Sequence, residues 1–341
     1  MTENLENLDF DKISASRKES ENTSLSHNLD DQVYALGFSN SKDKPMKVAI
    51  GSYLENENNK LRVLEVNDSR TSIAEKHTID QKYPSTAIMW SNFTNNEDHD
   101  LIATSSDCLR LYKETEEGID LKCELVNSQQ KELASPMTSF DWNPKQKEII
   151  CCASIDTTCS IWDIEEEKLS KLVIAHDKEV FDVSFSPEGY SFATVGADNT
   201  ARLFDIRDLT QSNIIYDHRE PLVRIAWNNS SKSNILALVS LFQEEIILLD
   251  IRQPFFPMTT LKYHKAPVNN VVWSPYSPYL LCSISTDKHA YLWNVEKMEE
   301  AITSPVLEYS SDQTLNNVTW CSFTDWIGIT KQNSFIMLRI I

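Results

Sequence analysis

Long apolar runs, glycine and paired cysteines are all scarce in this chain of 341 residues. No stretch approaches the roughly 18–20 apolar residues that a membrane-spanning helix needs, so membrane insertion is not expected. The seven cysteines are odd in number and form no CxxC pair, which argues against a disulfide framework and favours a reducing, intracellular environment. The opening residues, MTENLENLDFDKIS, contain neither a basic leader nor an apolar core, so no secretory signal is expected.

Positive charge is also in short supply. The 32 lysines and arginines are outnumbered by 51 aspartates and glutamates, which gives a formal net charge of −19. Nucleic acids and membrane surfaces are polyanions that are bound chiefly through lysine and arginine, so direct binding to either is not expected. Acidic character suits solubility and the attraction of basic segments of protein partners.

Catalytic signatures are missing as well. The sequence contains no HExxH, no GxSxG and no phosphate-binding GxxxxGK[ST], and it has only six glycines. His176 and His264 could act as bases or metal ligands on composition alone, but both fall at a repeated position, which favours a structural role. Cys151, Cys152 and Cys159 fall within or beside expected strands, as small buried residues do. We therefore expect a non-enzymatic protein without cofactor or metal.

The chain does contain a repeat. ADNTARLFDIR at 197–207 returns as IDTTCSIWDIE from Ile155, as TDKHAYLWNVE from Thr286 and, less faithfully, as FQEEIILLDIR at 242–252. A fixed period of this size is typical of a repeat architecture. The large residue before the Asp or Asn recurs every 42 to 45 residues, at Trp162, Phe204, Leu249 and Trp293.

A second marker is a short alternating apolar segment that ends in an aromatic residue. Period-two alternation with β-branched and aromatic residues indicates strands rather than helices. Three of these segments run into a proline, at Pro144, Pro187 and Pro275, which presets a turn and cannot donate to a sheet. The segments end 42 to 52 residues apart, at Phe38, Trp90, Trp142, Phe185, Trp227, Trp273 and Trp320.

Each repeat accommodates four strands, and so small a sheet cannot cover both of its faces alone. Seven such sheets that stack face to face and close into a ring can do so. The sequence thus predicts an all-β chain, with a disordered acidic and polar tail at 1–23 and a seven-bladed β-propeller at 24–341. Because SFIMLRII at the end leaves no residues for a fourth strand, we expect Ser24–Leu29 to supply it and close the ring. We expect a monomer.

The loops at the ends of a propeller channel form a rigid platform for peptides and other proteins. Aligning the blades on their strand-end aromatics gives one equivalent residue at the start of each innermost strand. Tyr34 and Phe181 would be good interface anchors, and the alternative is that both rings plug the channel. The seven candidate partner-binding residues are Tyr34, Thr86, Thr138, Phe181, Val223, Asn269 and Asn316.

The repeat resembles the WD repeat (WD40) of β-propeller proteins. In that family a histidine in the preceding loop hydrogen-bonds the acid of the turn. The resemblance implies two structural pairs here, His176 with Asp198 and His264 with Asp287. The fifth blade keeps His218 but has no acid at the matching turn position, and the first three blades lack a matching histidine.

A closer resemblance covers the chain from about Tyr34 onward. AHDKEVFDVSFS (175–186), TVGADNTARLFDIR (194–207) and TLNNVTW (314–320) are similar to the WD-repeat branch that contains the plant Transparent Testa Glabra and anthocyanin-regulating proteins. The animal member of that branch is a scaffold associated with kinases and cullin ubiquitin ligases. The resemblance implies a non-catalytic scaffold of cytoplasm and nucleus that docks protein kinases, transcription regulators or other proteins.

FATVGADNTARLFDIR (192–207) also resembles the box by which WD-repeat receptors contact the adaptor of cullin ligases, and Arg207 would be its contact residue. Phe204 stands where that box has tryptophan, and the second candidate box, 237–252, matches less well. The alternatives to a scaffold are therefore a cullin-ligase substrate receptor and a propeller enzyme with a channel site. A local role for Arg207, as a loop cation near Asp205 or Asp208, also stays open.

Overall fold

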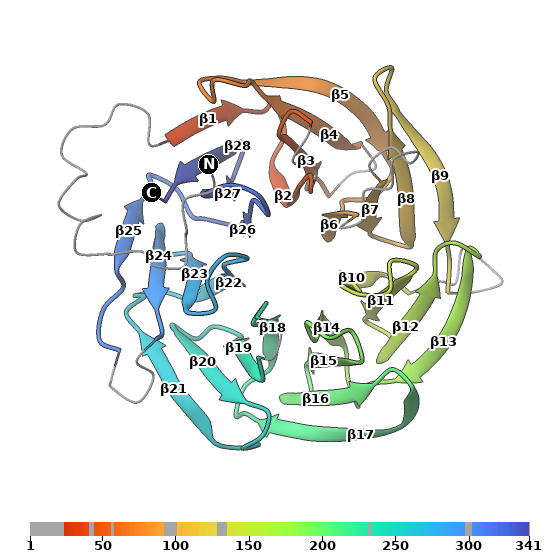
Figure 1. The fold of residues 1–341 in the computed structure, drawn as a ribbon, viewed down its shortest axis with the longest axis vertical. Helices are drawn as coiled ribbons and strands as arrows, with labels where there is room; N and C mark the ends of the chain where they lie inside the picture. Colours follow the sequence, from red (N-terminus) through yellow and green to blue (C-terminus); the bar gives the residue numbers. More distant parts are fainter. Residues whose placement is uncertain are drawn as a thin grey trace.

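All regular structure in the described residues is β-strand. The computed structural model describes residues 24–40, 44–55, 58–91, 101–127, 135–230, 233–296 and 302–340. Its strands form a ring of radial sheets around a central axis (Figure 1), which confirms the predicted all-β propeller. The tail expected at 1–23 lies outside the described residues. Within those residues, no helix has the length and hydropathy to cross a bilayer.

Seven four-stranded antiparallel sheets form the blades, numbered here around the ring and given from the innermost strand outward. Blade 1 consists of β2 (Val33–Phe38), β3 (Lys47–Ser52), β4 (Asn59–Val66) and β5 (Ile73–Gln81). Blade 2 consists of β6 (Ala87–Trp90), β7 (Leu101–Ser105), β8 (Leu109–Glu114) and β9 (Ile119–Leu125). Blade 3 consists of β10 (Met137–Trp142), β11 (Ile149–Ser154), β12 (Thr158–Asp163) and β13 (Lys168–Ile174).

The remaining blades follow the same order. Blade 4 consists of β14 (Val180–Phe185), β15 (Ser191–Gly196), β16 (Thr200–Asp205) and β17 (Asp208–Asp217). Blade 5 consists of β18 (Leu222–Trp227), β19 (Ile235–Ser240), β20 (Glu245–Asp250) and β21 (Pro257–Lys262). Blade 6 consists of β22 (Val268–Trp273), β23 (Leu280–Ser285), β24 (His289–Asn294) and β25 (Leu307–Ser310). Blade 7 consists of β26 (Asn317–Trp320), β27 (Trp326–Lys331), β28 (Ser334–Arg339) and β1 (Ser24–Asn28).

The outermost strand of blade 7 comes from the start of the described chain. Strand β1 pairs antiparallel with β28, and Leu25 lies opposite Met337 in that register. The segment SLSHN reads as polar, but its alternation buries Leu25 while Ser24 on the same strand is exposed. The predicted closure of the ring by an N-terminal strand is confirmed, and it covers the edge of β28 that would otherwise be open.

The hydrophobic core lies between the blades and not inside any one of them. One cluster joins Cys151 and Ala153 of blade 3 to Phe192 and Phe204 of blade 4, and corresponding clusters fill the other interfaces around the ring. The rings of Phe192 and Phe204 stack with their centroids 5.0 Å apart. The apolar residues before each repeated Asp or Asn therefore serve the packing of neighbouring blades, as the period predicts.

The acidic turn of the repeat is an aspartate that caps its own backbone. Oδ1 of Asp198 accepts a hydrogen bond from the N–H of Thr200 at 3.1 Å, and Oδ1 of Asp287 accepts one from His289 at 3.0 Å. The residue between them turns with a positive φ, 69° at Asn199. Asparagine tolerates this left-handed conformation and aspartate favours such turns, whereas Thr157 and Lys288 adopt it at the same point of blades 3 and 6, with φ of 77° and 72°.

Candidate functional site

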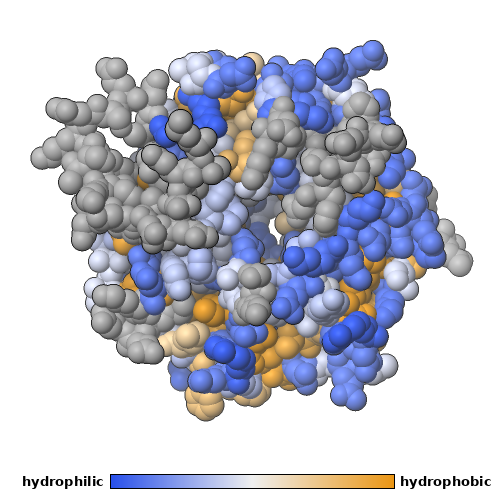
Figure 2. All heavy atoms as spheres, viewed as in Figure 1, coloured by the Kyte–Doolittle hydropathy of each residue, from blue (hydrophilic) through white to orange (hydrophobic). Residues whose placement is uncertain are grey.

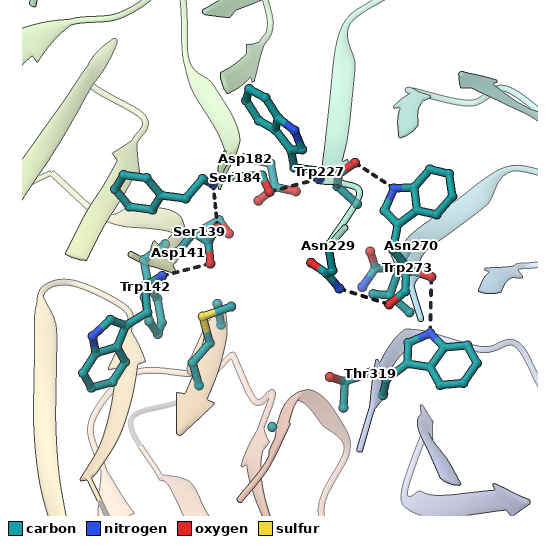
Figure 3. A pocket seen from close by; sticks show the side chains of 18 of the residues that line it. Ser139, Asp141, Trp142, Asp182, Ser184, Trp227, Asn229, Asn270, Trp273 and Thr319 are labelled. Atoms are coloured by element: carbon teal, nitrogen blue, oxygen red, sulfur yellow. Dashed lines mark hydrogen bonds between the residues drawn. The ribbon is translucent and has the colours of Figure 1, made fainter. Parts of the chain in front are cut away.

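The innermost strand of each blade turns one edge toward the central channel, where no further strand can pair with its N–H groups. Polar side chains of the inner strands take the place of that strand. Oδ2 of Asp141 in blade 3 accepts a hydrogen bond from the N–H of Phe185 in blade 4 at 2.6 Å. Oγ of Ser184 in blade 4 accepts one from the N–H of Trp227 in blade 5 at 3.1 Å. These contacts join neighbouring blades at the channel wall (Figure 3).

The channel encloses about 590 Å³ and is lined by the inner strands of all seven blades. It extends to the turns that follow these strands, where Pro144, Pro187 and Pro275 stand at its mouth. A space-filling view shows the ring hollowed at its centre (Figure 2). The composition of the wall varies around the ring: Ala87 and Met89 of blade 2 are small or apolar, whereas both carboxylates of the described lining, Asp141 and Asp182, come from blades 3 and 4.

One end of the channel is crossed by a contact between distant blades. Arg224 of blade 5 donates a hydrogen bond from Nη2 to the hydroxyl of Tyr34 in blade 1. Asp182 faces the same guanidinium. Burial raises the pKa of Asp182, while the charge of Arg224 opposes that rise. The crossing lies toward the face where the inner strands begin, so it narrows the channel at that end.

Asp141 has a different environment from Asp182. Its Oδ1 accepts the N–H of Trp142 at 2.9 Å, and its Oδ2 accepts the N–H of Phe185. No lysine or arginine of the described residues acts on this carboxylate, and burial raises its pKa to about 7. Asp141 is thus a channel carboxylate held by backbone donors alone.

The seven candidate partner-binding residues are all half-buried. Four of them bond a backbone carbonyl of the next blade; for example, Oγ1 of Thr138 donates to the carbonyl of Val180 at 2.7 Å and Nδ2 of Asn269 to that of Leu315 at 2.6 Å. Thr86 and Asn316 make the equivalent bonds. Their direct role in partner binding stays a prediction, and the contacts give these four side chains a structural role between blades.

Irregular pairing explains where these side chains point. The ladders of blades 3, 4, 5 and 6 shift register at Thr138, Phe181, Val223 and Asn269, each of which is the extra residue of a β-bulge. A bulge re-aims its side chain. Tyr34 lies within a similar shift in blade 1 and reaches Arg224. For Tyr34 the geometry therefore favours the plugging alternative.

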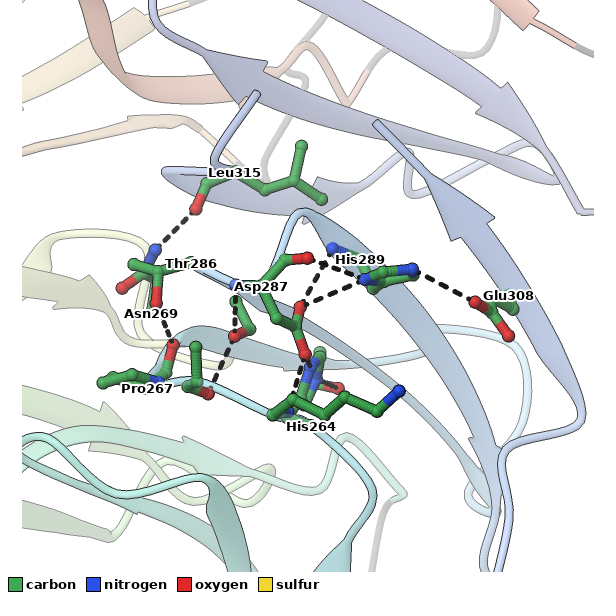
Figure 4. A network of polar contacts seen from close by, with 12 residues as sticks. His264, Pro267, Asn269, Thr286, Asp287, His289, Glu308 and Leu315 are labelled. Atoms are coloured by element: carbon green, nitrogen blue, oxygen red, sulfur yellow. Dashed lines mark hydrogen bonds and ion pairs between the residues drawn. The ribbon is translucent and has the colours of Figure 1, made fainter. Parts of the chain in front are cut away.

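The structure brings together both sets of predicted histidine and aspartate residues. Nδ1 of His176 lies 2.8 Å from Oδ1 of Asp198, and Nδ1 of His264 lies 2.9 Å from Oδ2 of Asp287 (Figure 4). Burial lowers the pKa of His264 despite the attraction of Asp287, and the same holds at His176. Burial alone would raise the pKa of Asp198, but its contacts with His176 and with backbone donors lower it to about 2.

A neutral histidine fits a hydrogen-bond chain that includes residues the sequence reasoning missed. In blade 6, Nε1 of Trp293 donates to Oγ of Ser283 at 2.9 Å, and that oxygen lies 2.8 Å from Nε2 of His264. With the proton of His264 on Nδ1, every group from Trp293 to Asp287 donates in one direction. In blade 4, Phe204 replaces the tryptophan and cannot donate. A hydroxyl residue follows the histidine at nearly the same spacing in both blades, 18 residues on at Thr194 and 19 residues on at Ser283, and this spacing could have revealed the chain.

Arg207 lies on the face opposite these histidines, in the turn after β16. It is 68% exposed, its Nη2 lies 2.6 Å from Oδ2 of Asp205, and its guanidinium stacks over the ring of Tyr190 at 5.2 Å. Arg252 of blade 5 repeats the arrangement with Asp250, at 2.5 Å and 69% exposure. The stretch 237–252, which contains Arg252, matches the repeat less well, so its sequence alone gives this second copy little support.

Possible metal ligands and reactive cysteines were candidates from composition, and the described part of the chain shows where they lie. No cluster of three or more histidine, cysteine or acidic side chains with ligand geometry occurs there. Cys151 and Cys152 are buried, and burial raises the pKa of both thiols well above the ordinary value, which keeps them protonated and unreactive.

The closed ring, the repeated turn acids and the paired histidines define a WD-repeat β-propeller. The sequence model of the WD domain, G-beta repeat family matches residues 127–163, 167–205 and 255–294. The last two matches each cover the outer strand of one blade and the three inner strands of the next.

Similar proteins extend the match beyond these three segments. The DDB1- and CUL4-associated factor 7 homolog of Dictyostelium discoideum is 37% identical over 313 residues, which cover 90% of this chain and 96% of that protein. An uncharacterized WD repeat-containing protein of Schizosaccharomyces pombe is 33% identical over 77% of this chain and 67% of its own length. A WD repeat-containing protein of Saccharomyces cerevisiae is 33% identical, and the match spans 54% of its length. The chain belongs to the WD-repeat family that includes the Dictyostelium factor.

The buried histidines predict how stability depends on pH. Because folding lowers their pKa, the unfolded chain binds more protons at these two sites below about pH 6.5, so the pair lowers stability as the pH drops from 7 to 5, while the raised pKa of Asp141 acts in the opposite direction. The double variant His176→Asn with His264→Asn should therefore lose less stability than wild type over this pH range. Urea midpoints followed by tryptophan fluorescence at pH 7, 6 and 5 measure it. His218→Asn, at the matching loop of blade 5, is the control and should keep the wild-type slope; equal slopes in all three proteins would contradict the assignment.

Proposed function

We propose that the chain is a non-catalytic adaptor that holds other proteins on the faces of its propeller. The observation that carries the proposal is the engagement of its catalysis-capable residues in structural contacts. His176 and His264 are buried in chains that tie loops to strands, and Asp182 caps the backbone of blade 5. The family supports the same class, since its Dictyostelium member is named as a factor associated with DDB1 and CUL4.

Protein kinases and transcription regulators are the partners that we propose, in cytoplasm and nucleus. This proposal is supported by the sequence resemblance to the Transparent Testa Glabra branch. That resemblance covers loop segments as well as strands. The net charge of −19 favours partner segments that are basic.

Affinity purification tests the adaptor role. A tagged chain expressed at near-native level should recover a protein kinase or a transcription regulator, identified by mass spectrometry, in excess over an untagged control. Reciprocal purification of the recovered partner should return this chain. If no protein is enriched over the untagged control in either direction, the adaptor proposal is wrong.

A second candidate function is substrate receptor of a cullin-type ubiquitin ligase. Two exposed Asp–x–Arg turns lie on the same face of neighbouring blades, Asp205 with Arg207 and Asp250 with Arg252. Each aspartate bonds the guanidinium of its arginine, and both arginine side chains remain mostly exposed and within reach of a partner. The name of the Dictyostelium relative supports the same assignment.

A pulldown with purified DDB1 tests this second function. Arg207→Ala and Arg252→Ala should each reduce recovery by about tenfold or more, because losing a charge-assisted hydrogen bond costs on the order of 1.5–3 kcal/mol. Arg339→Ala is a matched control, since Arg339 is also an exposed arginine paired with an aspartate, in blade 7. Unchanged recovery with both alanine variants would remove the receptor hypothesis and leave the adaptor role standing.

A further inference from the structure

Asp141 occupies an unusual place among the charged residues that line the channel. Among the described residues, four charged side chains line it: Asp141, Lys145, Asp182 and Arg224. Arg224 is engaged with Tyr34 and faces Asp182 at the narrowed end. Lys145 is exposed at the mouth. Asp141 lies between them and forms no ion pair with any described residue, so a carboxylate without a cation faces the open part of the channel.

The carboxylate of Asp141 can accept further hydrogen bonds beyond those it already makes. Each of its two oxygens accepts one backbone N–H, from Trp142 and from Phe185, and these bonds fix the plane of the carboxylate. A carboxylate oxygen can accept a second hydrogen bond, so one site remains on each oxygen. A guanidinium presents two parallel N–H donors and matches that pair of sites, whereas an ammonium can occupy them only as a point charge.

The wall around Asp141 suits a side chain with a cationic head and an apolar stem. In ring order, the equivalent position in the preceding blade is Met89, a flexible apolar residue, and Ala87 lies on the same inner strand. On the far side of the channel, Thr319 and Asn270 add hydroxyl and amide groups (Figure 3). An arginine stem can lie against the apolar wall while its head reaches the carboxylate.

The direction of approach follows from the two ends of the channel. The contact of Arg224 with Tyr34 narrows the end where the inner strands begin. At the opposite mouth, the described lining residues include Pro144, Pro187 and Pro275, whose side chains are short. This is also the face on which Arg207 is exposed, so one partner could use the channel mouth and the rim together.

We propose that the channel is a binding site for an arginine side chain of a protein partner, inserted from the proline-framed mouth with its guanidinium paired to Asp141. The inference rests on the proposed adaptor function and adds the chemistry of one contact. The acidic protein as a whole attracts such a basic segment, and the channel carboxylate selects its arginine.

The test uses the peptide acetyl-Gly-Ala-Arg-Ala-Gly-amide and the same peptide with neutral citrulline in place of arginine. Isothermal titration with the full chain should show saturable binding of the arginine peptide at concentrations up to about 5 mM, and binding of the citrulline peptide weaker by about tenfold or more. Asp141→Asn should weaken arginine binding by a similar factor. Asp312→Asn, which removes the same charge at an exposed position, should leave it within about twofold.

A second variant keeps the test decisive if Asp141→Asn does not fold. Thr319→Phe fills the channel from the opposite wall without touching the carboxylate, and should abolish arginine binding while its thermal midpoint shows a folded ring. The proposal is overturned if wild type does not bind the arginine peptide, if citrulline binds equally well, or if Thr319→Phe keeps wild-type affinity. If partners are still recovered by affinity purification in that case, the adaptor role stands and only the channel site fails.

Discussion

Every blade of this protein has two apolar faces, and neither can be covered by the four strands of that blade. The core therefore exists only as seven layers between blades, such as the one in which Phe192 and Phe204 meet Cys151 and Ala153. Such a ring covers the apolar faces of every blade only if the interface between blades 7 and 1 is also filled. Strand β1 does this, because Leu25 joins the cluster between blades 7 and 1. Closure is the constraint on which the channel, its rim and its faces all depend.

The same constraint explains how polar groups are used near the axis. Inner strands have an edge with no partner, so Asp141, Asp182 and Ser184 bond N–H groups of the following blade. Thr138 and Asn269 bond its carbonyls near the start of the strand. Thr138 and Asn269 are sequence candidates for partner binding, and these contacts give both of them a structural role in the ring. Among the described residues, the groups proposed to bind partners are the exposed arginines of two turns and a channel carboxylate that forms no ion pair.

The fold could be predicted from the sequence because the residues that recur at a fixed period are those that pack between neighbouring blades. The aromatic at the end of each inner strand and the apolar residues before each turn acid are needed in every blade, and their spacing sets the number of units. Closure by Ser24–Leu29 was also predictable, and Leu25 and Leu29 are the large hydrophobic residues of this segment that are buried.

The site was less predictable, for two physical reasons. A β-bulge re-aims the side chains at the start of the inner strands, so the spacing of the strand ends does not report that Thr138 and Asn269 bond the next blade, and their role in partner binding stays a prediction. Contacts across the channel join residues far apart in the chain, as Tyr34 and Arg224 do, and no local pattern reports them. Trp293 donates to Ser283, which contacts His264. Because all three lie within one repeat, their positions could have been found from the sequence spacing.

The measurement that tests ring closure most directly is equilibrium unfolding of Leu25→Asp in urea, followed by tryptophan fluorescence and far-ultraviolet circular dichroism. Leu25→Asp removes about 1.5–3 kcal/mol of stabilisation from apolar burial and places a charge in a buried position. Fluorescence and circular dichroism should therefore report the same transition, with a urea midpoint below that of wild type. Ser24→Asp, on the exposed side of the same strand, should leave that midpoint unchanged. An unaltered midpoint in Leu25→Asp would show that the ring is stable without its closing strand and would contradict the account.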